Sequence, residues 1–299
     1  MALMEEHRFK SQGVTCVGRL HRLDETPANR PCVVMGHGFG ATQDAGLQPF
    51  VDALVAADFA VFTFDYRHFG ESEGQPRQLL VIRREIQDWL AAIDTARSLP
   101  GVDPERIALW GTSLGGGLAT SAAARDGRVR ALVAQCPMMD GMASAMAVLG
   151  YAGTGYMARL AGHGLLDLLR GAVGAAPHYI PSAGSPGQIA AMSAEDALDG
   201  YLSLMPEGAP NKVAARITTR LMFCRPGTGA QRVQWPALIQ ICDRDTVAPA
   251  EAAARAVRKM SDAEERHYDV GHFDIYHGQP RERVLADQID FLKRHLQHP

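Results

Sequence analysis

The sequence predicts an α/β fold in which helices flank a mostly parallel central sheet. Short apolar runs alternate along the chain with stretches of helical periodicity, a pattern typical of parallel strands covered on both faces. The chain is also long enough to bury a substantial core, because 46% of its 299 residues are hydrophobic. The alternation is interrupted between residues 141 and 234, which predicts an insertion in the sheet domain.

The individual elements follow from the apolar runs and from helical periodicity. Asp103-Pro104, which precedes the fourth strand, indicates a turn because Asp-Pro pairs favour turn initiation. Strands are expected at 14–20, 32–35, 60–64, 107–110, 129–134, 237–241 and 266–270, and helices at 47–57, 79–98, 114–125, 250–260 and 282–295.

The interrupted interval is rich in Gly, Ala and Met and carries six prolines. Three stretches within it, 142–149, 157–169 and 189–204, hold enough apolar residues to pack as helices. The regular alternation resumes at Trp235-Pro236. We therefore expect a helical lid at 141–234, inserted between two parts of the sheet domain at 1–140 and 235–299.

Composition and charge argue against several classes of function. A net charge of −3 and a pI near 6.4 give no electrostatic reason to expect binding to nucleic acid or to an anionic membrane. Residues 141–157 are uncharged, but their glycines and the lack of a long Leu/Ile/Val run argue against a membrane-spanning helix. Glu5, Glu6 and Arg8 lie where a signal peptide would need an apolar run, so we expect a cytoplasmic protein.

The five cysteines are widely scattered and include no C-x-x-C pair. This pattern is typical of small buried hydrophobic residues in a reducing compartment, and not of a disulfide or zinc framework. We expect no cofactor and no metal, and a small-molecule substrate as the binding partner; a homodimer is left open. The cysteines are Cys16, Cys32, Cys136, Cys224 and Cys242.

The pattern G-x-S-x-G, which marks a nucleophile elbow, occurs twice, at 111–115 around Ser113 and at 70–74 around Ser72. An elbow requires a strand, a sharp turn and a helix, with small residues two positions from a strained serine. Ser113 meets this requirement, because an apolar run precedes it and a glycine-rich helical stretch follows it. Ser72 has acidic neighbours and Pro76 soon afterwards, which indicates a solvated loop.

A glycine-rich segment follows the expected strand at 32–35 and surrounds Phe39. Glycine lets the main chain pass close to a ligand, so the Phe39 N–H and the N–H of Leu114 could together form an oxyanion hole. The other interpretation is a tight turn that needs glycine for steric reasons alone. His37, in the same segment, is interpreted as a structural histidine that hydrogen-bonds to nearby loops.

His272 is the expected general base. In hydrolases with an elbow of this type the chain order is serine, acid and then histidine, with the base on a loop after one of the last strands. An expected strand ends at Val270, Gly271 permits a turn, and His272 follows on the loop. His277, further along, is the alternative.

Asp245 is the expected acid of the triad. It comes directly after the apolar strand at 237–241 and before an expected helix, where its carboxylate could orient the imidazole and stabilise the imidazolium. Asp243 is a nearby alternative. Asp140 also follows a strand end and remains open as the acid, although aspartates at such positions are often helix caps or turn residues.

Five segments of the chain resemble α/β-hydrolases, most closely the branch that groups dienelactone-hydrolase-like and acetyl-xylan-esterase-like proteins with fungal polyketide transferases. The resemblance implies an α/β-hydrolase fold with the nucleophile, acid and base at Ser113, Asp245 and His272. It also implies oxyanion donors at Phe39 and Leu114. The segments are HGFGAT at 37–42, FDYRHFGESEG at 64–74, GTSLGGG at 111–117, CDRDTVAP at 242–249 and GHFDIY at 271–276.

These residues predict hydrolysis of a carboxylic ester, lactone or thioester through an acyl-enzyme. The substrate is expected to be small and hydrophobic, similar to a polyketide. Acyl transfer to an alcohol, base-catalysed elimination and a non-catalytic small-molecule receptor are the alternatives. Adaptable apolar residues within the expected lid or just before it could form the acyl pocket or could merely pack on the core. These residues are Met138, Met142, Met146, Tyr151 and Met157.

Overall fold

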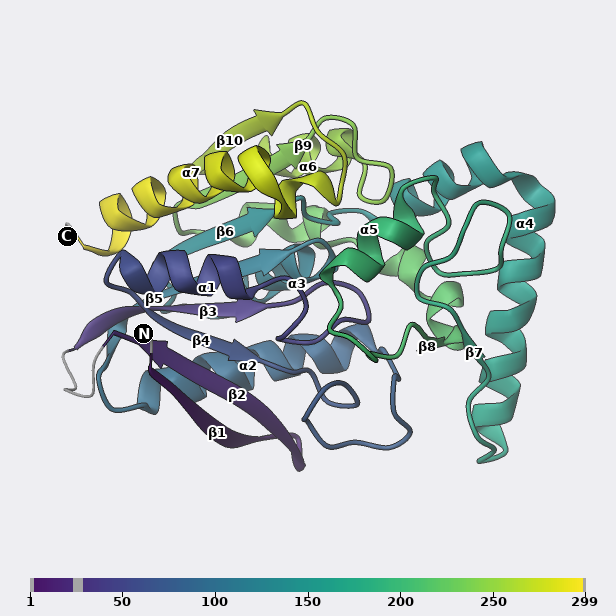
Figure 1. Cartoon of the computed structure of the whole chain (residues 1–299), viewed down its shortest axis with the longest axis horizontal. Coiled ribbons are helices and arrows are strands. Elements are labelled where there is room, and N and C mark those ends of the chain that lie inside the picture. Colours follow the sequence, from purple (N-terminus) through teal and green to yellow (C-terminus); the bar gives the residue numbers. More distant parts are fainter. Residues whose placement is uncertain (1–2, 24–28, 298–299) are drawn as a thin grey trace.

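The computed structural model describes residues 3–23 and 29–297 (Figure 1). An eight-stranded sheet crosses the molecule in the order β1-β2-β4-β3-β5-β6-β9-β10. β2 pairs antiparallel with β1 and β4, and the strands from β4 to β10 pair in parallel. The α/β class with a mostly parallel sheet is therefore confirmed. The strands are β1 (Leu3–Ser11), β2 (Val14–Arg22), β3 (Arg30–Gly36), β4 (Ala60–Phe64), β5 (Val102–Thr112), β6 (Ala131–Gln135), β9 (Ala237–Cys242) and β10 (Ala263–Tyr268).

Every strand expected from an apolar run lies in this sheet, but β1 was not predicted. β1 is an edge strand whose side chains are mostly exposed, so it carries no apolar run. β5 also begins earlier than predicted, and its pairing with β3 shifts register after Val102. The expected turn at Asp103-Pro104 falls in this irregular stretch, where the Asp103 carboxylate accepts a hydrogen bond from the Glu105 N–H at 3.0 Å.

Helices cover both faces of the sheet (Figure 1). α1 and α7 pack on one face around Phe50 and Trp110, and α2, α3 and α6 pack on the other around Trp89. Each such fully buried aromatic side chain contributes roughly 1.5–3 kcal/mol of hydrophobic stabilisation. The helices are α1 (Gln48–Ala56), α2 (Ile82–Ser98), α3 (Leu114–Ala123), α6 (Ala250–Val257) and α7 (Gly278–Leu296).

Three buried glutamines connect the sheet to α7. The side-chain amide of Gln288 in α7 donates to the side-chain oxygens of Gln135 and Gln240, at 3.0 and 2.6 Å. In turn, Gln288 accepts from the Trp110 indole at 3.0 Å, and Gln240 donates to the Tyr268 hydroxyl at 2.8 Å. A buried polar group without a partner costs about 1–3 kcal/mol. This network therefore holds α7 in one register on the sheet.

Residues 141–234, the segment predicted to be a lid, separate β6 from β9 in the sequence and are called the insertion below. Figure 1 shows them beyond the end of the sheet toward which the parallel strands point. The long helix α4 is interrupted at Gly153, whose φ of 79° is not helical. The elements of the insertion are α4 (Gly141–Ala172), β7 (Tyr179–Ile180), α5 (Ala197–Leu204), β8 (Val213–Ala214) and the 3-10 helices η1 (Ala215–Thr219), η2 (Leu221–Phe223) and η3 (Pro226–Arg232).

The helices expected in the insertion are found in part. The stretches 142–149 and 157–169 both belong to α4, but the stretch 189–204 is helical only from Ala197. Its first half is irregular instead, and the Met192 N–H and C=O bond to Ser182 and Gly184 in a neighbouring segment. The expected helix at 189–196 is therefore wrong, since apolar periodicity alone does not reveal such a pairing.

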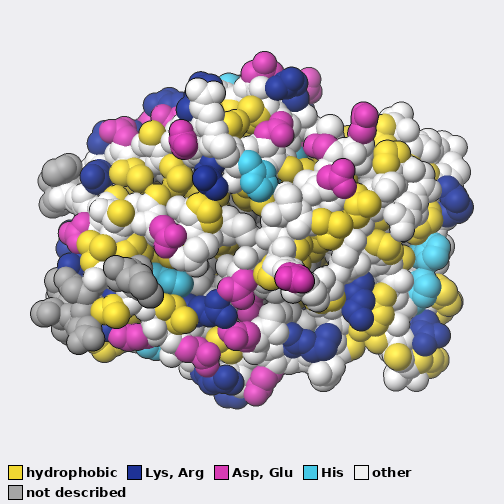
Figure 2. Space-filling view, in the orientation of Figure 1, with side chains coloured by type: hydrophobic (Ala, Val, Ile, Leu, Met, Phe, Trp, Pro, Cys, Tyr) yellow, Lys and Arg dark blue, Asp and Glu magenta, His cyan; other side chains and the backbone are white. Residues whose placement is uncertain are grey.

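The surface of the insertion is more apolar than that of the sheet domain. In the part of the chain that the structure describes, eight of the ten large hydrophobic side chains with high exposure belong to the insertion. Figure 2 shows acidic and basic side chains intermingled on one face of the molecule. Among helices within residues 3–23 and 29–297, none is both long and apolar enough to cross a membrane.

Candidate active site

Ser113 lies at the sharp turn between β5 and α3. Its φ of 56° and ψ of −125° are unusual for a residue with a side chain, a conformation that costs roughly 1–3 kcal/mol. A Cβ atom on Gly111 would lie 2.3 Å from the Gly115 carbonyl oxygen, and one on Gly115 would lie 2.2 Å from the His37 carbonyl oxygen. Both glycines of the motif are therefore required by close main-chain approach.

The structure brings Ser113, His272 and Asp245 together in that order. His272 Nε2 lies 3.0 Å from Ser113 Oγ, and His272 Nδ1 lies 2.6 Å from Asp245 Oδ2. The other oxygen of Asp245 accepts the N–H groups of Val247 and Ala248, at 2.8 and 2.6 Å. The His272 and Asp245 side chains are only 2% and 1% exposed, so solvent does not compete for these bonds.

Burial and charge act in opposite directions on the pKa of His272. Burial lowers the pKa, but the adjacent Asp245 carboxylate, with a smaller contribution from Cys136, raises it to about 9 from the usual 6.5. One pKa unit corresponds to about 1.4 kcal/mol, so this environment stabilises the imidazolium by about 3 kcal/mol relative to water. A histidine that accepts a proton from serine forms that cation, and the site favours it.

The glycine-rich segment after β3 passes directly beside the nucleophile. A Cβ on Gly38 would lie only 3.2 Å from Ser113 Cβ. The next amide, Phe39 N–H, has no acceptor within the described ranges, and Leu114 is the first residue of α3, whose N–H has no intrahelical partner. His37 is buried, and its Nδ1 lies 3.1 Å from the carbonyl oxygen of the adjacent Gly38.

Ser72, in the second G-x-S-x-G copy, is buried and not part of this cluster. Its hydroxyl donates to the Asp65 carbonyl at 2.6 Å and accepts the Val17 N–H at 2.9 Å. The expectation of a solvated loop was therefore wrong. The acidic neighbours lie nearer to solvent while Ser72 turns inward to join the loop to β2.

The alternative acids and base have other partners. Asp140 forms two hydrogen bonds with the Arg225 guanidinium, at 3.0 and 2.9 Å, and caps the N-terminus of α4. Asp243 lies 2.6 Å from His267 on β10. His277 lies 3.0 Å from a serine hydroxyl of α5. Their positions fit the ordinary roles of caps and surface pairs.

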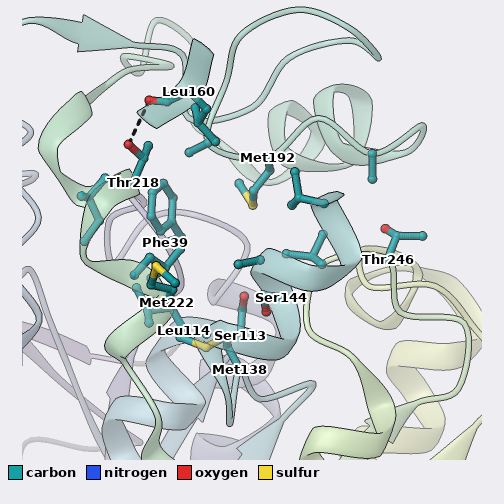
Figure 3. A pocket seen from close by; sticks show the side chains of 18 of the residues that line it. Phe39, Ser113, Leu114, Met138, Ser144, Leu160, Met192, Thr218, Met222 and Thr246 are labelled. Atoms are coloured by element: carbon teal, nitrogen blue, oxygen red, sulfur yellow. Dashed lines mark hydrogen bonds between the residues drawn. The ribbon is translucent and has the colours of Figure 1, made fainter. Parts of the chain in front are cut away.

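A cavity of about 130 Å³ opens beside Ser113 between the sheet domain and the insertion. Its wall is mostly apolar, and Figure 3 shows Phe39, Leu114, Met138 and Met192 around it. Both residues whose N–H groups could form an oxyanion hole, Phe39 and Leu114, belong to this wall. The cavity can therefore hold an apolar group next to the serine hydroxyl.

Three of the five residues expected in the pocket line this cavity, namely Met138, Tyr151 and Met157. Met142 and Met146 are not part of the wall, and the Met146 side chain is 56% exposed. The expectation for these two was wrong because composition does not tell which face of a helix turns inward.

The sequence analysis missed other lining residues. Ser144 and Val148 lie on α4 at helical spacing from the expected Tyr151, and both line the cavity. A search for one helix face would therefore have found them. Met192 lies in an irregular segment and Met222 in the short 3-10 helix η2. For these two the sequence carried no periodic signal.

A second, smaller space of about 30 Å³ lies on the His272 side of the nucleophile. His272, Tyr201, Phe273 and Tyr276 line it. The two spaces adjoin at Ser113, which lines both.

A nucleophile elbow at the carboxyl end of a mostly parallel eight-stranded sheet defines the α/β-hydrolase class. Residues 27–278 match the family described as serine aminopeptidase, S33, and the chain belongs to this family. It is 44% identical to the quorum-quenching protein AidA of Acinetobacter baumannii (strain MDR-ZJ06) over 289 residues, which cover 96% of this chain and 93% of AidA.

Two fungal proteins are similar over nearly the whole chain. The polyketide transferase claH of Penicillium crustosum is 26% identical, covering 95% of this chain and 94% of its own. The crystal structure of the α/β hydrolase GrgF from Penicillium sp. sh18 matches 99% of both chains with a TM-score of 0.80 at 24% identity, which shows a shared fold. The expected relation to polyketide-transferase-type hydrolases is thus confirmed.

Proposed function

We propose that this protein is a serine hydrolase that cleaves a carboxylic ester, lactone or thioester with an apolar acyl group. The observation that carries the proposal is the hydrogen-bonded chain from Asp245 through His272 to Ser113 at the edge of an apolar cavity. A serine hydroxyl is a weak nucleophile until an adjacent, oriented base removes its proton. The cavity supplies the apolar surface that holds a substrate at that hydroxyl.

The chemistry follows from this arrangement. Ser113 Oγ attacks the carbonyl carbon as its proton passes to His272 Nε2, and the carbonyl electron pair moves onto oxygen. The N–H groups of Phe39 and Leu114 stabilise that oxyanion, each by about 3–4 kcal/mol. The imidazolium then protonates the leaving group as its bond to carbon breaks. Water repeats the sequence on the acyl-enzyme and releases the acid, while Asp245 remains ionised.

The space on the His272 side supports water as the acyl acceptor. Its volume is about 30 Å³, and a water molecule needs roughly 10–15 Å³ of such space. Water placed there lies next to His272, the group that must remove its proton. Acyl transfer to a small alcohol is the second candidate, because the relative claH is named a polyketide transferase.

The test is a panel of ethyl esters, acylated lactones and thioesters with acyl chains of graded length, assayed by release of the acid. Acylated lactones belong in it because a lactone is a cyclic ester that the same attack by Ser113 would open. We expect turnover of at least one class and stoichiometric labelling of Ser113 by a serine-directed phosphonate. Ser113→Ala should abolish labelling and lower kcat by about 10⁶.

Two results would overturn the proposal. The first is a wild-type protein that neither reacts with the phosphonate nor releases acid from any member of the panel. The second is full turnover by Ser113→Ala. Products formed with an added small alcohol identify the acceptor: free acid indicates hydrolysis, and a new ester indicates transfer.

A further inference from the structure

Met192 is the residue of the insertion that lines both spaces at the nucleophile. Within the described ranges the two spaces share three residues, which are Phe39, Ser113 and Met192. Phe39 and Ser113 belong to the sheet domain, so Met192 closes the junction from the opposite side. Figure 3 shows the Met192 side chain, with its sulfur, among the residues around the cavity.

The backbone that carries Met192 is fixed although its side chain is adaptable. The Met192 N–H donates to the Ser182 carbonyl at 3.0 Å, and the Met192 carbonyl accepts the Gly184 N–H at 2.9 Å. A bridge to Ala183 joins the same two segments. Methionine is unbranched and rotates about three bonds, so its end adjusts to its neighbours. Met192 therefore combines an anchored position with a deformable tip.

The reaction assigns a different part of the substrate to each space. The leaving atom must face His272, which protonates it, and the smaller space lies on that side. The acyl chain is the other substituent of the carbonyl carbon, so it extends away from His272 into the larger space. The space assigned to the acyl chain has a volume of about 130 Å³, and the space assigned to the leaving group has a volume of about 30 Å³. The volumes therefore match a long acyl chain and a small leaving group.

We propose that Met192 divides the acyl site from a separate leaving-group site and restricts the leaving group to a small one. The substrate class is then a long apolar acyl chain joined to a compact alcohol or thiol. This inference rests on the proposed hydrolase function. Removing the Met192 side chain should join the two spaces and admit a larger leaving group.

The first experiment uses isomeric esters, so that total apolar surface stays constant while the carbonyl moves along the chain. Ethyl octanoate, butyl hexanoate and octyl acetate form such a series. We expect kcat/KM of the wild type to fall by at least about tenfold from the first to the last, in line with the discrimination of a hydrophobic pocket. Met192→Ala should reduce this ratio to about twofold or less.

Two other methionines provide matched controls. Met222 lines only the larger space, and Met205 lines only the smaller one. Met222→Ala should preserve the order of the isomers, because the division remains. Met205→Ala should improve butyl hexanoate but not octyl acetate, since it enlarges the smaller space without joining the two. Equal effects of all three substitutions would overturn the role of Met192 as a divider.

The second experiment is independent of turnover. Isothermal titration calorimetry of Ser113→Ala compares two isomeric ketones that cannot be cleaved. In 2-nonanone the carbonyl carries one short and one long alkyl arm, and in 5-nonanone it carries two equal arms. We expect Ser113→Ala to prefer 2-nonanone by about tenfold, and Ser113→Ala with Met192→Ala to bind both about equally. If the protein prefers 2-nonanone but the wild type cleaves no ester, the hydrolase function is refuted and the divided site is still supported. Equal binding of the isomers before Met192 is changed, or no binding of either, would refute the divided site.

Discussion

Replacing Asp245 with asparagine should shift the pH dependence of catalysis as well as lower its rate. The pKa of His272 is raised to about 9, and only the neutral imidazole acts as a base, so wild-type kcat/KM should rise about tenfold per pH unit up to that value. Without the carboxylate, burial still lowers the pKa, which should fall below the ordinary 6.5. The displacement of more than two pH units corresponds to about 3 kcal/mol.

The rate at the plateau should also fall, by about 10⁴, because the asparagine amide favours the wrong tautomer of His272. The assay measures octanoate released from ethyl octanoate by wild type and Asp245→Asn across about pH 5 to 10. Asp140→Asn is the matched control. It loses the charge of the pair with Arg225, but its remaining side-chain oxygen can still cap α4. It should therefore lower the melting temperature slightly and leave the pH profile unchanged.

Two results would refute this reasoning. An Asp245→Asn variant whose acid limb coincides with that of wild type would mean that Asp245 does not set the pKa of His272. A loss of several orders of magnitude in Asp140→Asn, with a mild effect in Asp245→Asn, would assign the acid to the end of β6.

Three further predictions concern the buried Ser72, two methionines of α4 and the stability contributed by His272. Ser72→Ala removes two buried hydrogen bonds and should lower the free energy of unfolding by about 1–3 kcal/mol while phosphonate labelling stays intact; lost labelling would contradict this. Met157→Ala should change the acyl length with the highest kcat/KM, and Met146→Ala should not, since only Met157 lines the cavity; identical effects would count against it. From pH 6.5 to 9 the wild type should lose about 3 kcal/mol more stability than His272→Gln, because the raised pKa of His272 favours the folded state only while the imidazole is protonated; parallel stability curves would refute it.

The turn around Ser113 could be predicted because its steric demands are local. Gly111 and Gly115 approach other backbone atoms so closely that no side chain fits. Only glycine satisfies such a requirement, so the requirement can be recognised in the sequence. Gly38 beside the nucleophile is less constrained, since a Cβ there would lie 3.2 Å from Ser113 Cβ. The fold class was predictable for a similar reason, since strands buried on both faces must be apolar throughout.

The substrate pocket could not be predicted in the same way. Met146 and Met157 are chemically identical and lie on one helix, yet only Met157 faces the cavity. Met192 is held in position by backbone hydrogen bonds with Ser182 and Gly184, and no periodic pattern in the sequence predicts these bonds. β1 escaped prediction because an exposed edge strand needs no apolar run. Each of these outcomes depends on a distant partner and not on local sequence.

The strand order also determines when neighbouring strands can pair during synthesis on the ribosome. β6 ends at Gln135, but its partner β9 begins only at Ala237. At translation rates of roughly 5–20 residues per second, the open edge of β6 waits about 5–20 s for that partner. Unpaired apolar edges recruit other strands. A nascent chain that stalls inside the insertion is therefore at the greatest risk of aggregating, and a holdase chaperone bound at β6 would protect it.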